Sequence, residues 1–441
     1  MKHSRSLLHS IVLRPCPHVR RKLSPTPAYF PRLNVNPPTC LHSVQKPFFS
    51  FSLRTRTVNR STPPHPPNKG AIKKPLGPMP HAPATPHEKS AKESAKEKPA
   101  HNPTDRTTLI PRHFPRRYGV IGTGAVGGLY GGYLQKAGAE VHFLARNDFA
   151  SLRDHGLHIR SEEPGTADIH LPQVNVHNSP HSMPPCDILL VALKSTQNHL
   201  LGTLLPPALA PGGTVVILQN GFGNEEVARK EIGNDDVILV GGLCFLCAQR
   251  TQPGTVRHLA YGNVTLGASS RASLKDNSLS KKRSAKSSES IQNICADFRA
   301  AGIIIDTTKN LVAERWRKLV WNIPFNGLSV LLDAKTDELL ENADSMALTE
   351  KLMQETVTAA ASCGHKIPES HIQKMMDLAI AMPSYAPSMK VDFNAGRPLE
   401  IEAIYGAPLR AAHAAGASLP TIETLYWQLG FLDHHIRQQH T

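Results

Sequence analysis

Three polar residues follow one another at intervals of four in the C-terminal half of the chain: Lys318, Asn322 and Asn326. Side chains spaced in this way lie on one face of an α-helix. A lysine ammonium can donate a proton to a substrate carbonyl, and two neighbouring amides can orient that carbonyl and a carboxylate through hydrogen bonds. The spacing therefore predicts either a catalytic helix face or an ordinary face turned to water.

A glycine-rich run, YGVIGTGAVG at residues 118–127, predicts a dinucleotide site. Its apolar start is typical of a strand, and residues 128–137 are expected to form the helix that follows. In such a turn Gly122 permits the tight bend, Gly124 leaves room for the pyrophosphate, and Gly127 lets the helix pack closely on the sheet. The residues expected to line the cofactor there are Gly122, Thr123, Gly124, Ala125, Val126 and Gly127.

The next apolar segment, residues 140–146, bears on which nucleotide binds. An acidic residue at this strand tip usually accepts hydrogen bonds from the ribose hydroxyls of NAD, whereas an arginine suits the 2′-phosphate of NADP. The strand ends in Arg146, so NADPH/NADP+ is the favoured cofactor. Two alternatives stay open: Arg146 is a solvated loop residue, or Asp148 contacts the ribose.

Further apolar segments lie at residues 188–193, 214–218, 237–246 and 264–267, each ending near Gly, Asn or Lys. Strands of this kind that alternate with helices predict a mostly parallel sheet. Ligands bind beyond the carboxyl ends of parallel strands, so Lys194 and Asn220 are candidates for contacts with cofactor and substrate. Each also has a plainer interpretation, as a solvated loop lysine and as part of an Asn-Gly turn.

From Glu314 onward the apolar residues recur every three or four positions, most clearly over residues 339–363, 371–382 and 401–416. This spacing indicates helices. The sequence thus predicts an α/β Rossmann-type domain over residues 117–306 and an all-α domain over residues 307–441. A serine- and lysine-rich stretch, residues 269–290, is expected to be a flexible surface insertion that phosphorylation could modify.

The formal net charge of +15 at pH 7 is concentrated in the first part of the chain. Residues 1–117 hold 22 Lys and Arg against four acidic residues, while the rest holds 28 against 31. Because the body is nearly neutral, the composition argues against a nucleic-acid partner. No apolar run reaches the roughly 18 residues that a membrane helix needs.

The first 116 residues are expected to be a disordered leader, because they are basic and hold 21 of the 37 prolines. Residues 1–22 mix Leu, Ile and Val with Arg and Ser and contain no acid, which is typical of an organellar transit peptide. The mitochondrial matrix is the favoured location, with a plastid or the cytoplasm as alternatives.

The seven cysteines are scattered, which does not suggest a disulfide framework. Cys244 and Cys247 stand three apart in a predicted strand, where they would point to opposite faces and could not share a metal. We expect both to be core residues and predict no metal site.

Two longer motifs, RWRKLVWNIPFNGLSVL at 315–331 and SMKVDFNAGRPLEIE at 388–402, complete a resemblance to the ketopantoate reductase (2-dehydropantoate 2-reductase) family over about residues 117–432. The resemblance implies NADPH-dependent reduction of 2-dehydropantoate to pantoate, a step of pantothenate and coenzyme A biosynthesis. It also implies that Lys318 donates the proton and that Glu400 orients it. By the same resemblance Asn220, Asn322, Asn326 and Ser388 contact the substrate, and Lys194 lies beside the nicotinamide.

Two features of these motifs bear on the site. Pro324 lies between the two asparagines, and a proline there is expected to remove a helix hydrogen bond, kink the axis and leave Asn326 less securely placed. Glu402, close to Glu400, could take its role. The open alternatives for function are reduction of another branched 2-oxo acid and a non-catalytic NADP-binding sensor or RNA-binding protein. The expected partner is a small-molecule 2-oxo acid, and a homodimer is an open alternative.

Overall fold

The computed structural model describes residues 114–269 and 278–439, all of which belong to one compact unit, Ala100–Thr441. The predicted transit peptide and nearly all of the expected disordered leader lie outside these residues. Within the described ranges no helix is long and apolar enough to cross a bilayer.

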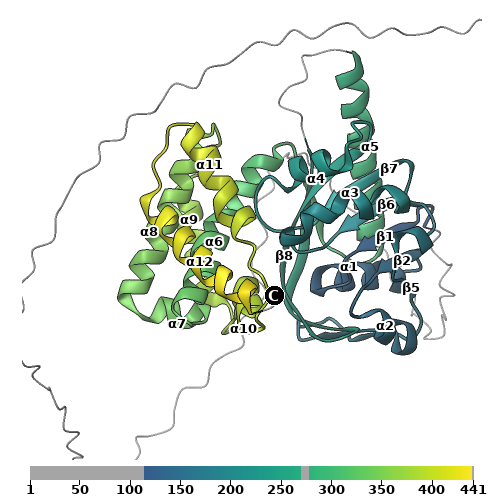
Figure 1. Cartoon of the computed structure of the whole chain (residues 1–441), viewed down its shortest axis with the longest axis horizontal. Helices are drawn as coiled ribbons and strands as arrows, with labels where there is room; N and C mark the ends of the chain where they lie inside the picture. The colour runs from purple at the N-terminus through teal and green to yellow at the C-terminus, as the bar shows by residue number, and fades with distance from the viewer. Residues whose placement is uncertain (1–113, 270–277, 440–441) are drawn as a thin grey trace, which may run out of the picture. The chain divides into compact units, whose positions relative to one another are not determined.

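The described residues form one ten-stranded, mostly parallel sheet with the strand order β4-β3-β9-β8-β7-β6-β1-β2-β5, and with β10 paired to β9 (Figure 1). From β5 to β8 all neighbours are parallel, whereas β8 with β9 and β3 with β4 are antiparallel. The strands are β1 (Tyr118–Ile121), β2 (Val141–Leu144), β3 (Leu157–Ser161), β4 (Ile169–Leu171), β5 (Asn175–His177), β6 (Cys186–Val191), β7 (Leu209–Ile217), β8 (Ile238–Gln252), β9 (Thr255–Ala268) and β10 (Ile305–Thr308).

Both faces of this sheet are covered, which is why its central strands are continuous apolar runs. Leu190 of β6 belongs to the core beneath α1 and α5, while its neighbours Leu189 and Val191 belong to the core beneath α3 and α4. The helices of this region are α1 (Ala125–Lys136), α2 (Phe149–His155), α3 (Leu201–Leu204), α4 (Asn224–Ile232) and α5 (Ser278–Ala300).

The rest of the described chain is helical and has a core of its own, centred on Trp316, Ile323, Phe325 and Tyr405, all fully buried. Figure 1 shows these elements in green and yellow, grouped apart from the sheet. They are α6 (Leu311–Leu331), α7 (Thr336–Glu341), α8 (Ala343–Ser362), α9 (Ser370–Ala381), α10 (Ser388–Asn394), a π-helical turn η4 (Glu402–Gly406), α11 (Ala407–Ala414) and α12 (Pro420–Gln438). The predicted fold class is confirmed.

Two boundaries differ from the sequence prediction. The expected domain limit after residue 306 falls inside β10, which ends at Thr308. Residues 278–290, expected to be part of a flexible insertion, form the first half of α5. Buried Ile291, Ile294 and Phe298 recur at helical spacing in the second half and anchor the helix on the sheet, so the polar first half continues it. Residues 270–277 of the expected insertion lie outside the described ranges.

Pro324 does not end its helix. α6 runs from Leu311 to Leu331 with Pro324 inside it, because the flanking Ile323 and Phe325 are fully buried in the helical core. Tyr405 donates a hydrogen bond from its hydroxyl to the Ile323 carbonyl at 2.8 Å. The expected loose placement of Asn326 is wrong: the residue is 1 % exposed, and its Oδ1 accepts a hydrogen bond from the Met389 amide at 3.1 Å.

Cys244 and Cys247 are both buried and unpaired, in keeping with the expectation of core cysteines. Burial raises the pKa of the Cys247 thiol to about 12, so this side chain is neutral under ordinary conditions.

Candidate active site

The glycine turn between β1 and α1 has the shape that a pyrophosphate requires. Gly122 adopts a φ of 99°, which side chains rarely tolerate, and a Cβ on Gly127 would lie 2.2 Å from the Gly122 carbonyl oxygen. A Cβ on Gly124 would instead meet no atom within 4 Å, so the space above this backbone is open. Because α1 starts at Ala125, its free amide groups face the same space. These residues fit the phosphates of a dinucleotide.

A single cavity of about 1120 Å³ runs from this turn to the helical region. Its wall includes the turn residues Gly122 to Val126, the strand-end residues Lys194 and Asn220, and Lys318 and Asn322 of α6. Ligand sites of drug-sized molecules typically measure about 300–1,000 Å³, so a dinucleotide and a small acid can share this space.

Lys318 is held at the centre of this cavity by two acceptors. Its Nζ donates to Asn220 Oδ1 and to the Cys244 carbonyl oxygen, each at 2.7 Å, and lies 5.6 Å from the centre of the Phe245 ring. Burial lowers the pKa of Lys318 to about 8. An ammonium carries three N–H donors, so one remains for a ligand. The lysine is therefore charged at neutral pH and still able to release its proton.

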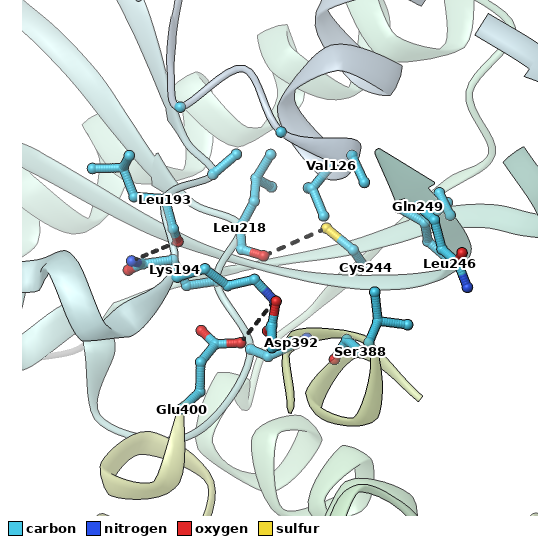
Figure 2. A pocket seen from close by; sticks show the side chains of 18 of the residues that line it. Val126, Leu193, Lys194, Leu218, Cys244, Leu246, Gln249, Ser388, Asp392 and Glu400 are labelled. Atoms are coloured by element: carbon cyan, nitrogen blue, oxygen red, sulfur yellow. Dashed lines mark hydrogen bonds and ion pairs between the residues drawn. The ribbon is translucent and has the colours of Figure 1, made fainter. Parts of the chain in front are cut away.

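The carbonyl of Cys244 faces Lys318, while its thiol lies 3.8 Å from the Leu218 carbonyl oxygen. Figure 2 shows the thiol turned toward Leu218. The Asn220 side chain faces Lys318 as well, so it is more than a turn residue.

The two asparagines of α6 both line the cavity but make different contacts. Asn322 is 5 % exposed and lines the cavity, and its Nδ2 has no hydrogen-bond partner among the described residues. A buried donor without a partner is costly, which suits a group that binds substrate. Asn326 lies one turn further on, where its Oδ1 binds the first turn of α10 and so holds Ser388, which also lines the cavity.

Glu400 does not hydrogen-bond to Lys318, contrary to the orienting role expected for it. Its carboxylate accepts from the Ser195 amide at 2.8 Å, from the Ser195 hydroxyl at 2.9 Å and from Lys194 Nζ at 3.4 Å. It acts on Lys318 only through electrostatic attraction, which opposes the effect of burial on the lysine pKa. Glu402 does not compete for this place, because it is exposed and paired with Arg410.

Lys194 is not a free loop lysine. Its Nζ lies 2.7 Å from Asp392 Oδ2 and 3.4 Å from Glu400 Oε2, and Figure 2 shows the three side chains converging from different elements. Burial disfavours the charge on Lys194, but the two carboxylates outweigh burial and raise its pKa. This cluster joins the carboxyl end of β6 to the helical region.

Arg146 lies at the other end of the cavity, just beyond β2, and is exposed. Its side chain makes no hydrogen bond or ion pair with the described part of the chain. Asp148 is buried close by and is paired with Arg250 of β8.

Sequence reasoning missed Ser195, Asp392, Arg250, Arg315 and the Cys244 carbonyl. Asp392 stands one helical turn after Ser388, so the same four-residue spacing could have indicated it. Arg315 donates to the Gln219 carbonyl at 2.7 Å and pairs with buried Glu225, which holds the Asn220 loop against α6. A backbone carbonyl such as that of Cys244 leaves no signal in a sequence.

The sequence matches two family models, described as Ketopantoate reductase PanE/ApbA over residues 118–271 and as its C terminal over residues 310–432. A 2-dehydropantoate 2-reductase from a Nostoc species is 46 % identical over 318 residues, which cover 72 % of this chain and 95 % of the relative.

Solved structures agree with this match. A 2-dehydropantoate 2-reductase from Geobacter metallireducens is 35 % identical with a TM-score of 0.64, over 72 % of this chain and 99 % of the other. One from Methylococcus capsulatus is 31 % identical with a TM-score of 0.62, over 73 % and 97 %. Two family models match the chain, a relative that is 46 % identical is covered over 95 % of its length, and the solved structures share the fold. The chain therefore belongs to the ketopantoate reductase family.

Proposed function

We propose that this protein reduces 2-dehydropantoate to pantoate with NADPH. The observation that carries the proposal is the placement of Lys318, a lysine with a lowered pKa whose third N–H points to no protein acceptor in the described structure. Family membership and the 2-dehydropantoate 2-reductases among its relatives support the substrate.

A reduced nicotinamide held by the glycine turn would supply hydride to C2 of the 2-oxo acid. Lys318 donates the proton to the C2 oxygen as negative charge develops there, and solvent returns a proton to the lysine after release. Asn220 Oδ1 and the Cys244 carbonyl aim Nζ at one position throughout, so little reorganisation is needed. The free Nδ2 of Asn322 offers a hydrogen bond to the substrate carboxylate.

The direct test is oxidation of NADPH by the purified full-length chain with 2-dehydropantoate, followed by absorbance, with pantoate identified as the product. Other branched and bulky 2-oxo acids form the comparison set. The part of the cavity wall that the helical region forms includes Trp321, Met375, Leu378 and Met382. These side chains favour apolar substituents and make a bulkier 2-oxo acid the second candidate. A bulkier acid with a larger kcat/KM would replace 2-dehydropantoate as the substrate.

The pH dependence of kcat/KM should report Lys318. The reduction needs the protonated lysine, and the pKa of about 8 means that the protonated fraction is nearly complete at pH 6 to 7 and falls above pH 8. We expect kcat/KM to be flat on the acid side and to fall about tenfold per pH unit well above 8. Oxidation of pantoate needs the neutral lysine and should rise over the same range. A reduction profile that stays flat far beyond pH 8 would contradict the role of Lys318 as proton donor.

Preference for NADPH over NADH should depend on Arg146. Its side chain is exposed in the cavity just beyond β2, where the adenosine ribose of a dinucleotide binds. A charge-assisted hydrogen bond contributes about 1.5–3 kcal/mol, so we expect Arg146→Ala to raise the KM for NADPH roughly tenfold to a hundredfold. The KM for NADH should change little. Equal effects on both cofactors would place Arg146 outside the phosphate site.

A further inference from the structure

The adenosine end of the cavity contains an ion pair that belongs to neither the proton-donor site nor the glycine turn. Asp148, four residues beyond the end of β2, accepts a hydrogen bond from Arg250 of β8, 102 residues away. Both residues line the cavity together with Arg146. The Asp148 side chain is only 5 % exposed, whereas that of Arg250 is 38 % exposed. The arginine is therefore the more exposed partner of this ion pair at the cavity wall.

Asp148 lies two residues beyond Arg146 and about 20 residues beyond the glycine turn, close to where NAD-binding proteins carry an acid for the ribose hydroxyls. Only one of its oxygens is satisfied: Oδ1 binds Arg250, while buried Oδ2 has no hydrogen-bond partner among the described residues. A carboxylate oxygen left in this way at a cavity wall is suited to accept a ribose hydroxyl. This position alone would favour NADH.

The charged side chains around Asp148 favour NADPH instead. A 2′-phosphate carries nearly two negative charges at pH 7, and an unscreened carboxylate in the same part of the cavity would repel it. Arg250 cancels the charge of Asp148, and Arg146 adds a positive charge with no partner in the described structure. The three side chains together are therefore cationic.

We propose that Arg250 determines the cofactor preference: it screens Asp148 and, with Arg146, forms the receptor for the 2′-phosphate of NADPH. Asp148 keeps the ability to bind ribose hydroxyls, and NADH gains from that acid as soon as Arg250 no longer covers it. The proposal deepens the proposed function and rests on its assignment of a reduced nicotinamide dinucleotide as the cofactor.

A purely structural role is the rival explanation. The β8–β9 hairpin reaches α2 (Figure 1), and a second contact joins them, from the Ser151 hydroxyl to the Pro253 carbonyl at 3.0 Å. If the Arg250–Asp148 pair only anchored the hairpin, its loss would weaken both cofactors alike. Loss of the Ser151 contact, which lies outside the cavity wall, would then have the same effect.

The test is direct binding of NADPH and of NADH to the full-length chain by calorimetry, without any 2-oxo acid. The variants are Arg250→Gln, Asp148→Asn, the double variant, and Ser151→Ala as the control at the same hairpin contact. Each change is close in size to the native side chain, and melting temperatures report folding.

For Arg250→Gln we expect NADPH to bind roughly ten- to a hundredfold more weakly, since a charged partner of the phosphate is lost and a carboxylate is exposed. NADH should change less than about threefold or bind more tightly. For Asp148→Asn we expect NADPH to bind more tightly, because the carboxylate beside the phosphate loses its negative charge. NADH should change less than about threefold, because Arg250 covers the acid in the native chain. The double variant should recover part of the NADPH affinity lost in Arg250→Gln, and Ser151→Ala should leave the ratio of the two affinities unchanged.

Equal losses for both cofactors in Arg250→Gln, or a changed ratio in Ser151→Ala, would overturn the inference while leaving the proposed reductase function intact. If Arg250→Gln does not fold, Asp148→Asn alone decides: an unchanged ratio of affinities would overturn the inference. Failure of the native chain to bind either nucleotide would refute the proposed function itself and this inference with it.

Discussion

Replacing Lys318 by alanine is expected to lower kcat for 2-dehydropantoate by roughly 10²–10⁴-fold, the usual contribution of a positioned general acid. Asn220 Oδ1 and the Cys244 carbonyl oxygen hold the Nζ of Lys318 in the cavity. Among the described residues no second lysine binds these two acceptors, so none could take over the proton transfer. Water would have to protonate the C2 oxygen in its place. Turnover is measured by NADPH oxidation under saturating substrate.

Binding of NADPH should survive this substitution, because the glycine turn and the adenosine end of the cavity are formed by other elements. The fall of kcat/KM above pH 8 should also disappear, which a merely structural role of Lys318 would not explain. Lys351→Ala is the matched control, since Lys351 is exposed on α8 and lies outside the cavity wall. Turnover within about threefold of the native value in Lys318→Ala would remove Lys318 from the mechanism.

Gly124→Val should abolish cofactor binding and leave the fold intact. The backbone of Gly124 is extended with a negative φ, at φ −88° and ψ −157°, and a Cβ there meets no protein atom within 4 Å. The added methyl groups would occupy the space that the pyrophosphate needs. We expect NADPH affinity to fall at least roughly a hundredfold, because the phosphates lose their contact with the turn and with the α1 amides. Calorimetric titration and the melting temperature measure the two effects.

Two other glycines make this prediction specific. In Gly127→Ala the new Cβ would lie 2.2 Å from the Gly122 oxygen and 2.8 Å from Val120 Cγ1, so this variant should be destabilised by about 1–3 kcal/mol or more. Gly430 of α12 has open space around it as Gly124 does but lies outside the cavity wall, so Gly430→Val should change neither binding nor stability appreciably. Undiminished NADPH binding by Gly124→Val would mean that the phosphates bind elsewhere.

Local patterns in the sequence predicted the elements that depend only on residues a few positions apart. The glycine turn, the apolar runs of β1, β6 and β7 and the helical spacing after Glu314 are all of this kind. The short strands β3, β4, β5 and β10 were missed, because each spans only three to five residues, holds at most two buried ones and carries no clear periodicity.

The helical spacing of Lys318, Asn322 and Asn326 also follows from the sequence, but their separate tasks do not. Asn326 holds α10, whereas Asn322 is left with a free donor. A proline inside α6 is tolerated because the helical core packs on both of its neighbours, and this packing involves residues distant in the chain.

The sequence by itself determined that a dinucleotide turn precedes a helical region in which Lys318, Asn322 and Asn326 share one helix face, because a turn and a helix face depend on residues a few positions apart. Only the tertiary structure decided which groups those residues meet. Asn220 lies 98 positions before Lys318, Ser195 lies 205 before Glu400, and Asp148 lies 102 before Arg250. Whether a lysine can release its proton, and whether an acid repels a phosphate, depends on burial and on charges brought close by folding. No spacing along the chain contains that information.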